Sequence, residues 1–205
     1  MEFRKSQLRK MIKGKPLFKE FPNQLNSKEE VERNIHRLFD QLNESDQFIC
    51  DGEFNHYGSG YASFVEFFCV KKDGSAVLSE SYHEKDSVTS LDLEGVVVYV
   101  SRLAPLAVFG MDNRLKYIQE EDGEKLEMYS GTSYLGVDKI NHVPEKFEHV
   151  VEEIRNRLFE AGYLIGDQTY LKQPLPFKAA IPTILTMPDF GEEYTIFDAI
   201  FYWSD

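Results

Sequence analysis

The sequence predicts one globular α+β domain over residues 1–205, built on a mainly antiparallel sheet of about six or more strands with two long amphipathic helices packed on one face. Apolar residues recur at helical spacing in two segments, and β-branched and aromatic runs separated by turn residues fill the region between them. The chain has 205 residues, of which 42% are hydrophobic and 14% aromatic, so it can bury a sizeable core.

A short basic segment opens the chain. Residues 1–20 contain seven of the 23 Lys and Arg but two of the 35 Asp and Glu, a local balance of +5 against −17 for the rest. Leu8, Met11 and Ile12 stand at helical spacing, which predicts a short helix ended by Gly14. We expect this basic N-terminal segment, about residues 1–20, to dock on the acidic surface of its own domain or of a neighbouring subunit.

Two longer helices follow from capping signals and apolar stripes. Ser27 and Glu30 form a capping box before a stripe that predicts a helix over residues 28–43. Pro144 opens a second helix, which Gly162 closes. Each helix has one apolar face, so both are expected to pack on the sheet.

The region from residue 47 to about 135 has the pattern of strands. Residues 61–71 and 75–82 flank Asp73-Gly74, a dipeptide that favours a tight β-hairpin. Residues 95–103 include Val-Val-Val-Tyr-Val, which is typical of a central strand covered on both faces.

The remaining strands are predicted as a meander and a C-terminal extension. Segments 106–110, 115–119 and 125–129 read as three strands, with a turn at Met-Asp-Asn between the first two. Another strand is expected at 181–185. The alternation of side chains over 194–203 predicts a terminal strand that completes the sheet.

The cysteines and the absence of long apolar runs bear on the compartment. Cys50 and Cys69 lie in apolar surroundings, where we expect two buried free thiols. No apolar run is long enough for a membrane span, and the N-terminal segment lacks the apolar stretch of a secretory signal. We therefore expect a cytoplasmic protein.

The strong motifs of enzyme chemistry are missing from the sequence. It has no Cys-x-x-Cys pair, no phosphate-binding loop ending in Gly-Lys-Ser/Thr and no dinucleotide-binding glycine motif. His83-Glu84 resembles the start of a zinc-protease helix, but Ser87 stands where the second His is needed. We therefore predict no metal, no cofactor and no assigned catalytic residue.

One polar loop is a candidate binding site. It joins two carboxylates, an amide, an imidazole and two aromatic rings to a glycine-rich turn: Asp51, Glu53, Asn55, His56, Tyr57 and Tyr61. As a site, it offers His56 as a general base oriented by Asp51 or Glu53, or mixed ligands for a cation. As a purely structural feature, it is a strand end and a hairpin turn.

A second possible carboxylate pair depends on the predicted hairpin. Glu66 and Glu80 would face each other across the Asp73-Gly74 turn, and two carboxylates in a cleft can do acid–base work. The alternative is structural: one of the two carboxylates simply faces solvent, which accounts for both residues without a catalytic role.

Two functions remain open on these grounds. The acidic body disfavours nucleic acid and favours a basic protein partner, so the first hypothesis is a noncatalytic intracellular binding protein. Small bacterial toxin-immunity proteins share this size and charge, an analogy that no motif supports. The alternative is a small hydrolase or metal-dependent enzyme that uses the loop from Asp51 to Tyr61. The sequence leaves the oligomeric state unspecified.

Overall fold

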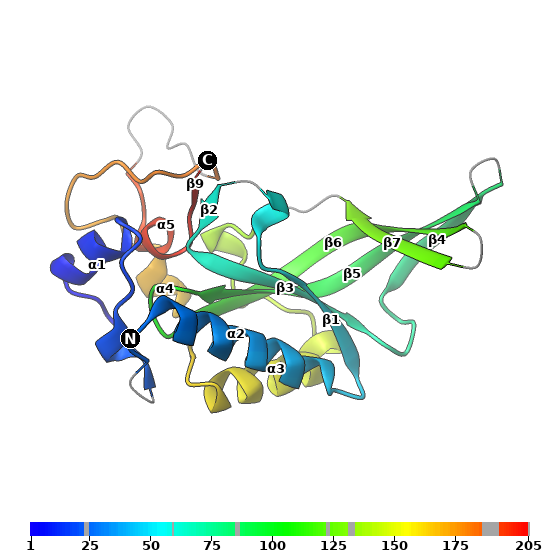
Figure 1. Cartoon of the computed structure of the whole chain (residues 1–205), viewed down its shortest axis with the longest axis horizontal. Helices are drawn as coiled ribbons and strands as arrows, with labels where there is room; N and C mark the ends of the chain where they lie inside the picture. Colours follow the sequence, from blue (N-terminus) through cyan, green and yellow to red (C-terminus); the bar gives the residue numbers. More distant parts are fainter. Residues whose placement is uncertain are drawn as a thin grey trace.

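A long, twisted antiparallel sheet organises the computed structural model (Figure 1). The structure describes residues 1–22, 25–58, 60–84, 87–121, 124–130, 134–185 and 193–204. The main path of the sheet runs β1 (Phe48–Glu53), β3 (Phe64–Lys71), β5 (Val88–Ser101), β6 (Leu106–Glu121) and β7 (Glu124–Ser130). β4 (Val77–His83) pairs with β5, β8 (Leu164–Ile165) pairs in parallel with β6, and β2 (Tyr61–Ala62) pairs with β9 (Trp203–Ser204) in a small second sheet. The α+β class and the mainly antiparallel sheet are therefore confirmed.

The described residues form five α-helices, whereas the sequence predicts one short helix and two long ones. Three of the five observed helices have seven or more residues. The helices are α1 (Lys5–Met11), α2 (Lys28–Asn43), α3 (Glu148–Glu160), α4 (Gln168–Leu171) and α5 (Ile196–Ile200), with 3₁₀ turns at Phe18–Glu20, His56–Gly58, Val137–Lys139 and Glu145–Phe147. Ser27 caps α2 by accepting a hydrogen bond from the N–H of Glu30, as the sequence indicates.

Helices cover both faces of the inner part of the sheet. Val65 and Phe67 of β3 point to the face on which α2 and α3 pack. Phe64 and Tyr99 point to the opposite face, where they join a core with α1, α4 and α5. Strand residues alternate between faces, so β3 and the inner half of β5, residues 95–101, are buried on both sides. This accounts for the nearly continuous apolar sequence of these two segments.

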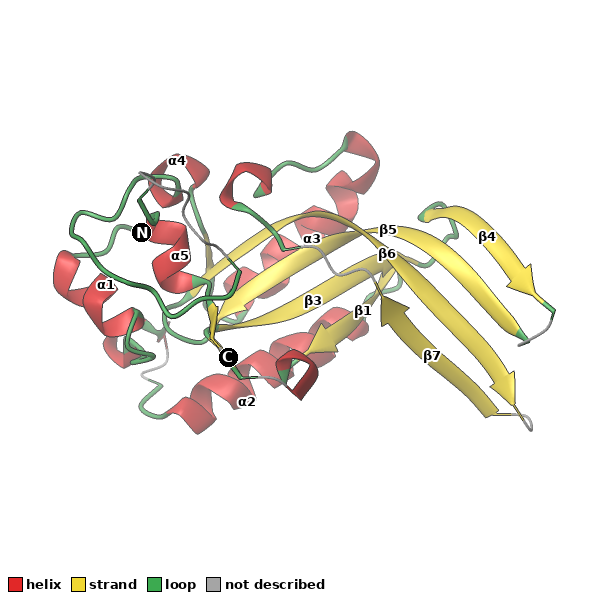
Figure 2. Cartoon of the chain, turned by 90° about the horizontal axis from the view of Figure 1, so that it is seen from above, coloured by secondary structure: helices red, strands yellow, loops and turns green. Residues whose placement is uncertain are grey.

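The outer part of the sheet extends beyond these helices. β5 and β6 pair continuously from Val100 with Ala107 out to Val88 with Gln119. Their outer halves, with β4 on one edge and β7 on the other, project as the arm seen on the right of Figure 2. We define the arm as residues 77–95 and 112–130. Every residue of β4 is exposed, in contrast with the buried β3.

A disulfide joins the two cysteines, so the expectation of free thiols is wrong. Cys50 of β1 and Cys69 of β3 face each other in the antiparallel register, with their Cα atoms 4.1 Å apart. The sequence alone does not reveal this register. Because disulfides are uncommon in reducing compartments, the bond gives no support to the predicted cytoplasmic location. Within the described residues, no helix has the length and apolar character needed to cross a membrane.

The predicted hairpin at Asp73-Gly74 is also wrong, although Gly74 does adopt a turn conformation with φ of +80°. β3 and β4 both pair with β5, β3 along its inner half and β4 along its outer half. A strand of 14 residues has room for both partners on one edge. Consequently Glu66 lies opposite Tyr99 and Glu80 lies opposite Leu91, so these two carboxylates do not form a pair.

Three further predictions, one of a turn and two of strands, also fail. The Met-Asp-Asn sequence at 111–113 lies inside β6, where Asp112 is buried against Arg114 instead of forming a turn. Residues 196–200 form α5 because Thr195 and Asp198 make a reciprocal capping box, whose local hydrogen bonds override the alternation. Residues 181–185 contain no strand.

Candidate functional site

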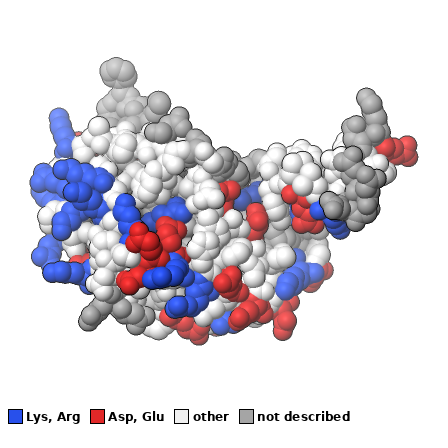
Figure 3. Space-filling model, viewed as in Figure 1, with Lys and Arg blue, Asp and Glu red and all other residues white. Residues whose placement is uncertain are grey.

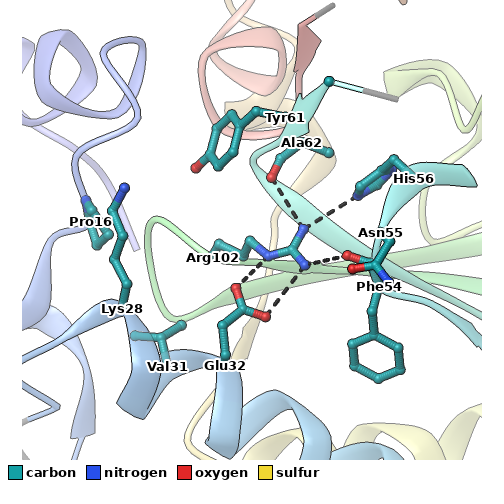
Figure 4. A pocket seen from close by; sticks show the side chains of 11 residues that line it. Pro16, Lys28, Val31, Glu32, Phe54, Asn55, His56, Tyr61, Ala62 and Arg102 are labelled. Atoms are coloured by element: carbon teal, nitrogen blue, oxygen red, sulfur yellow. Dashed lines mark hydrogen bonds and ion pairs between the residues drawn. The ribbon is translucent and has the colours of Figure 1, made fainter. Parts of the chain in front are cut away.

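A concave pocket lies where the candidate loop meets α2 and the chain after β5 (Figure 4). Its volume is about 270 Å³. Apolar and polar side chains from four separate stretches line it: Pro16, Lys28, Val31, Glu32, Phe54, Asn55, His56, Gly60, Tyr61, Ala62 and Arg102. The pocket is slightly smaller than the roughly 300–1,000 Å³ of typical small-molecule sites.

Arg102 lies at the centre of the pocket wall, and all five of its N–H groups have acceptors within the chain. Nε donates to Oε1 of Glu32 at 2.6 Å, and Nη2 approaches Oε2 of the same carboxylate at 3.4 Å. Nη2 also donates to the carbonyl of Phe54 at 2.7 Å. Nη1 donates to the carbonyls of Ala62 and Phe64, at 3.2 and 2.6 Å. A guanidinium has five donors, so none is left for a ligand.

His56 forms another part of the wall and is buried, with 5% of its surface exposed. Its Nε2 lies 2.7 Å from the carbonyl oxygen of Phe64. A carbonyl can only accept, so Nε2 carries the proton. The ring packs against Phe64 and Trp203, with centroids 5.1 and 5.4 Å away.

The surroundings of His56 make it a weak base. Burial lowers its pKa, and the Arg102 guanidinium, whose Nη1 lies 3.4 Å from Nε2, lowers it further. The Phe64 carbonyl and the more distant Glu53 and Glu32 act in the opposite direction without reversing the shift. The imidazole is therefore neutral at pH 7. A general base needs a pKa nearer the working pH, so this environment does not favour base catalysis.

The structure divides the residues of the candidate loop between different surroundings. Asn55, His56 and Tyr61 line the pocket. Asp51 lies in β1 opposite Phe68, outside the pocket. Oε1 of Glu53 accepts a hydrogen bond from the N–H of Asn55, which fixes the turn that follows β1. Tyr57 belongs to the 3₁₀ turn, and its side chain lies outside the described part of the structure.

Three charged residues that line this pocket are not predicted as site residues from the sequence. Lys28 and Glu32 come from α2, and Arg102 follows β5. The separation of 70 residues between Glu32 and Arg102 hides their pairing in the sequence. The available signal was an Arg two residues after the apolar run Val96–Val100, because such a position places the side chain at the rim of the core.

A second polar cluster lies at the base of the arm. Arg114 of β6 is 3% exposed and pairs with Asp112 at 2.9 Å and with Glu66 at 2.7 Å. Its guanidinium lies 4.3 Å from the centroid of the Phe68 ring. Burial raises the pKa of Glu66, and the charge of Arg114 opposes this shift. The hydrogen bonds of this triad link β3 to β6 across β5, where the covered sheet becomes the arm.

No protein-family model, curated protein or solved structure matches this chain. Function must therefore be argued from its own residues. Within the described ranges, no group of three or more His, Cys, Asp or Glu side chains is arranged to hold a metal ion.

Replacing Arg102 should destabilise the fold. The Arg102→Ala variant leaves the Glu32 carboxylate and the carbonyls of Phe54 and Ala62 without this donor, whereas His56 still donates to the carbonyl of Phe64. We expect a loss of about 2–4 kcal/mol in the free energy of unfolding. Denaturant titration measures this loss. Arg102→Lys keeps the positive charge but has fewer hydrogen-bond donors, so its free energy of unfolding should lie between those of the wild type and Arg102→Ala. A loss below about 0.5 kcal/mol for Arg102→Ala would contradict the structural role of this side chain.

His56 should make stability depend on pH. Its pKa is lowered in the folded protein, so below about pH 6.5 the unfolded chain binds a proton that the folded chain resists, and stability is lost as the pH falls. His56→Asn removes the titrating imidazole and should therefore reduce this loss of stability. Asn is the chosen replacement because it tolerates the positive φ of 47° at this position. Unfolding free energies measured between pH 7 and pH 5 test this. A slope for His56→Asn equal to that of the wild type would refute the expectation.

Proposed function

We propose that this chain is a noncatalytic binding protein that uses its arm to capture a basic protein partner. The observation that carries the proposal is the uncovered sheet of the arm, which combines exposed apolar side chains with a strong excess of acidic residues. The pocket at His56 adds support, because its central cation is fully occupied by internal hydrogen bonds and its imidazole is a weak base.

The apolar part of this surface lies on one face of the arm. β6 and β7 pair Tyr117 with Met128 and Gln119 with Leu126, so Leu115, Leu126 and Met128 share a face. These three side chains are 39%, 55% and 49% exposed. Contiguous exposed apolar side chains with a polar surround are typical of protein-binding surfaces.

The charge of the arm indicates the chemistry of the partner. Residues 77–95 and 112–130 contain eleven Asp and Glu but four Lys and Arg, a balance of −7. Among the described side chains of the arm, Glu80, Glu84 and Glu127 are exposed, whereas Asp112 is buried. Exposed carboxylates attract a partner rich in Lys or Arg and accelerate its association at low salt. A basic toxin neutralised by an immunity protein would be one partner of this kind, by the analogy of size and charge alone.

The surface of the arm can be tested by removing its apolar groups without changing its charge. We expect Leu126→Ser with Met128→Ser to weaken partner binding by at least about tenfold, since each fully buried side chain of this size contributes about 1.5–3 kcal/mol. The partner is first captured from an extract of the source cell at about 50 mM salt and then released at about 500 mM, where charge attraction is strongly screened. Binding is then measured with both proteins purified.

The matched control is Phe159→Ser, because Phe159 is 72% exposed on α3, away from the arm. This variant should bind as the wild type does. Equal weakening by both variants would place the partner elsewhere. Recovery of the bare protein at both salt concentrations would contradict capture by charge.

A further inference from the structure

The N-terminal end of the molecule carries a cationic surface that its own fold leaves open. α1 is held by apolar contacts, since Leu8 and Met11 are fully buried in the core with α5. The Tyr202 hydroxyl donates to the carbonyl of Met11, and the N–H of Phe3 donates to the hydroxyl of Tyr170. Attraction between charges is therefore not what docks this segment.

The cations of residues 1–20 point outward. All seven are exposed: Arg4, Lys5, Arg9, Lys10, Lys13, Lys15 and Lys19. Arg9 lies over the ring of Phe177 at 4.6 Å. In the part of the chain that the structure describes, none of the seven lies within ion-pair distance of a carboxylate. We call these seven side chains the basic end.

The basic end and the acidic arm lie at opposite ends of the longest axis. Figure 1 places α1 at one extreme and the tip of β4 at the other, and Figure 3 shows Lys and Arg gathered over the α1 end. Glu80 and Glu84, near that tip, are exposed. One chain therefore displays a cationic surface and the anionic, partly apolar surface that complements it.

We propose that two copies of the chain associate antiparallel, with the basic end of each on the arm of the other. A twofold arrangement of this kind forms the same contact twice and closes without exposing a further pair of complementary ends. The methylene stems of Lys and Arg can cover Leu126 and Met128 while the charged groups face carboxylates. Each copy has a net charge of −12, so the association is weak and depends strongly on salt.

This self-association goes beyond the proposed function and can fail separately from it. A basic protein partner and the basic end of a second copy would compete for the same arm. Weakening the basic end should therefore leave partner capture at the wild-type level or raise it. A wild-type protein that captures its partner but does not self-associate would overturn only the present inference.

Charge reversal tests the inference, with sedimentation velocity as the measurement of the dimer fraction. At about 50 mM salt the wild type should associate reversibly, and at about 500 mM its dissociation constant should rise at least tenfold. Lys10→Glu with Lys13→Glu lowers the charge balance of residues 1–20 from +5 to +1, and Glu80→Lys with Glu84→Lys lowers that of the arm from −7 to −3. Each double variant alone should be monomeric at the concentration at which the wild type dimerises, because the attraction between the two surfaces is then much weaker.

An equimolar mixture of these two double variants should form dimers again, since each supplies the charge that the other now needs. Arg33→Glu with Arg37→Glu changes the charge by the same amount on α2 and should leave self-association within about twofold of the wild type; circular dichroism checks the folding of each variant. A wild type that is monomeric at low salt, or a mixture that stays monomeric, would overturn the inference.

Discussion

The pairing of β5 with β6 is the constraint on which the rest of the structure depends. The two strands stay in one register from the covered core to the end of the arm. Their inner halves are rich in Val, Ala and Phe and require cover on both faces, which α2 and α3 supply on one side and α1, α4 and α5 on the other. Their outer halves, from about Gly95 and Asp112, lack this apolar continuity and remain without helices (Figure 2).

Two arginines, the buried Arg114 and the half-buried Arg102, link the strands of this sheet to neighbouring segments. Arg114 lies at the base of the arm and pairs with both Glu66 and Asp112, so that these two buried carboxylates have a cationic partner. Arg102 ends the inner half of the hairpin and binds three carbonyls of the neighbouring loop. A pocket whose central guanidinium already donates all of its N–H groups to the chain offers little to a substrate. This is why we assign function to the outer sheet and not to the concavity beside His56.

The sequence predicts the elements with strong local signals. The capping box at Ser27 and the stripe that follows predict α2 with the observed limits, and the run Val96–Val100 predicts a strand buried on both faces. The sequence does not predict which strands and side chains lie next to each other in the fold. The Asp73-Gly74 turn does not show that β4 prefers the outer half of β5, and nothing near Cys50 reveals that Cys69 lies opposite. The salt bridge between Glu32 and Arg102 likewise depends on tertiary structure, so the pocket could be located only in part, through Asn55, His56 and Tyr61.

Both the proposed function and the proposed self-association require that the arm is folded before anything binds to it. Hydrogen–deuterium exchange of the free protein tests this requirement directly. If the β5–β6 pairing continues unbroken, the alternate backbone amides that pair between residues 88–95 and 112–119 will exchange much more slowly than unstructured peptide, as those of the inner strands do. Exchange of these outer amides at the rate of an unfolded chain, with the inner strands still protected, would contradict a preformed docking surface.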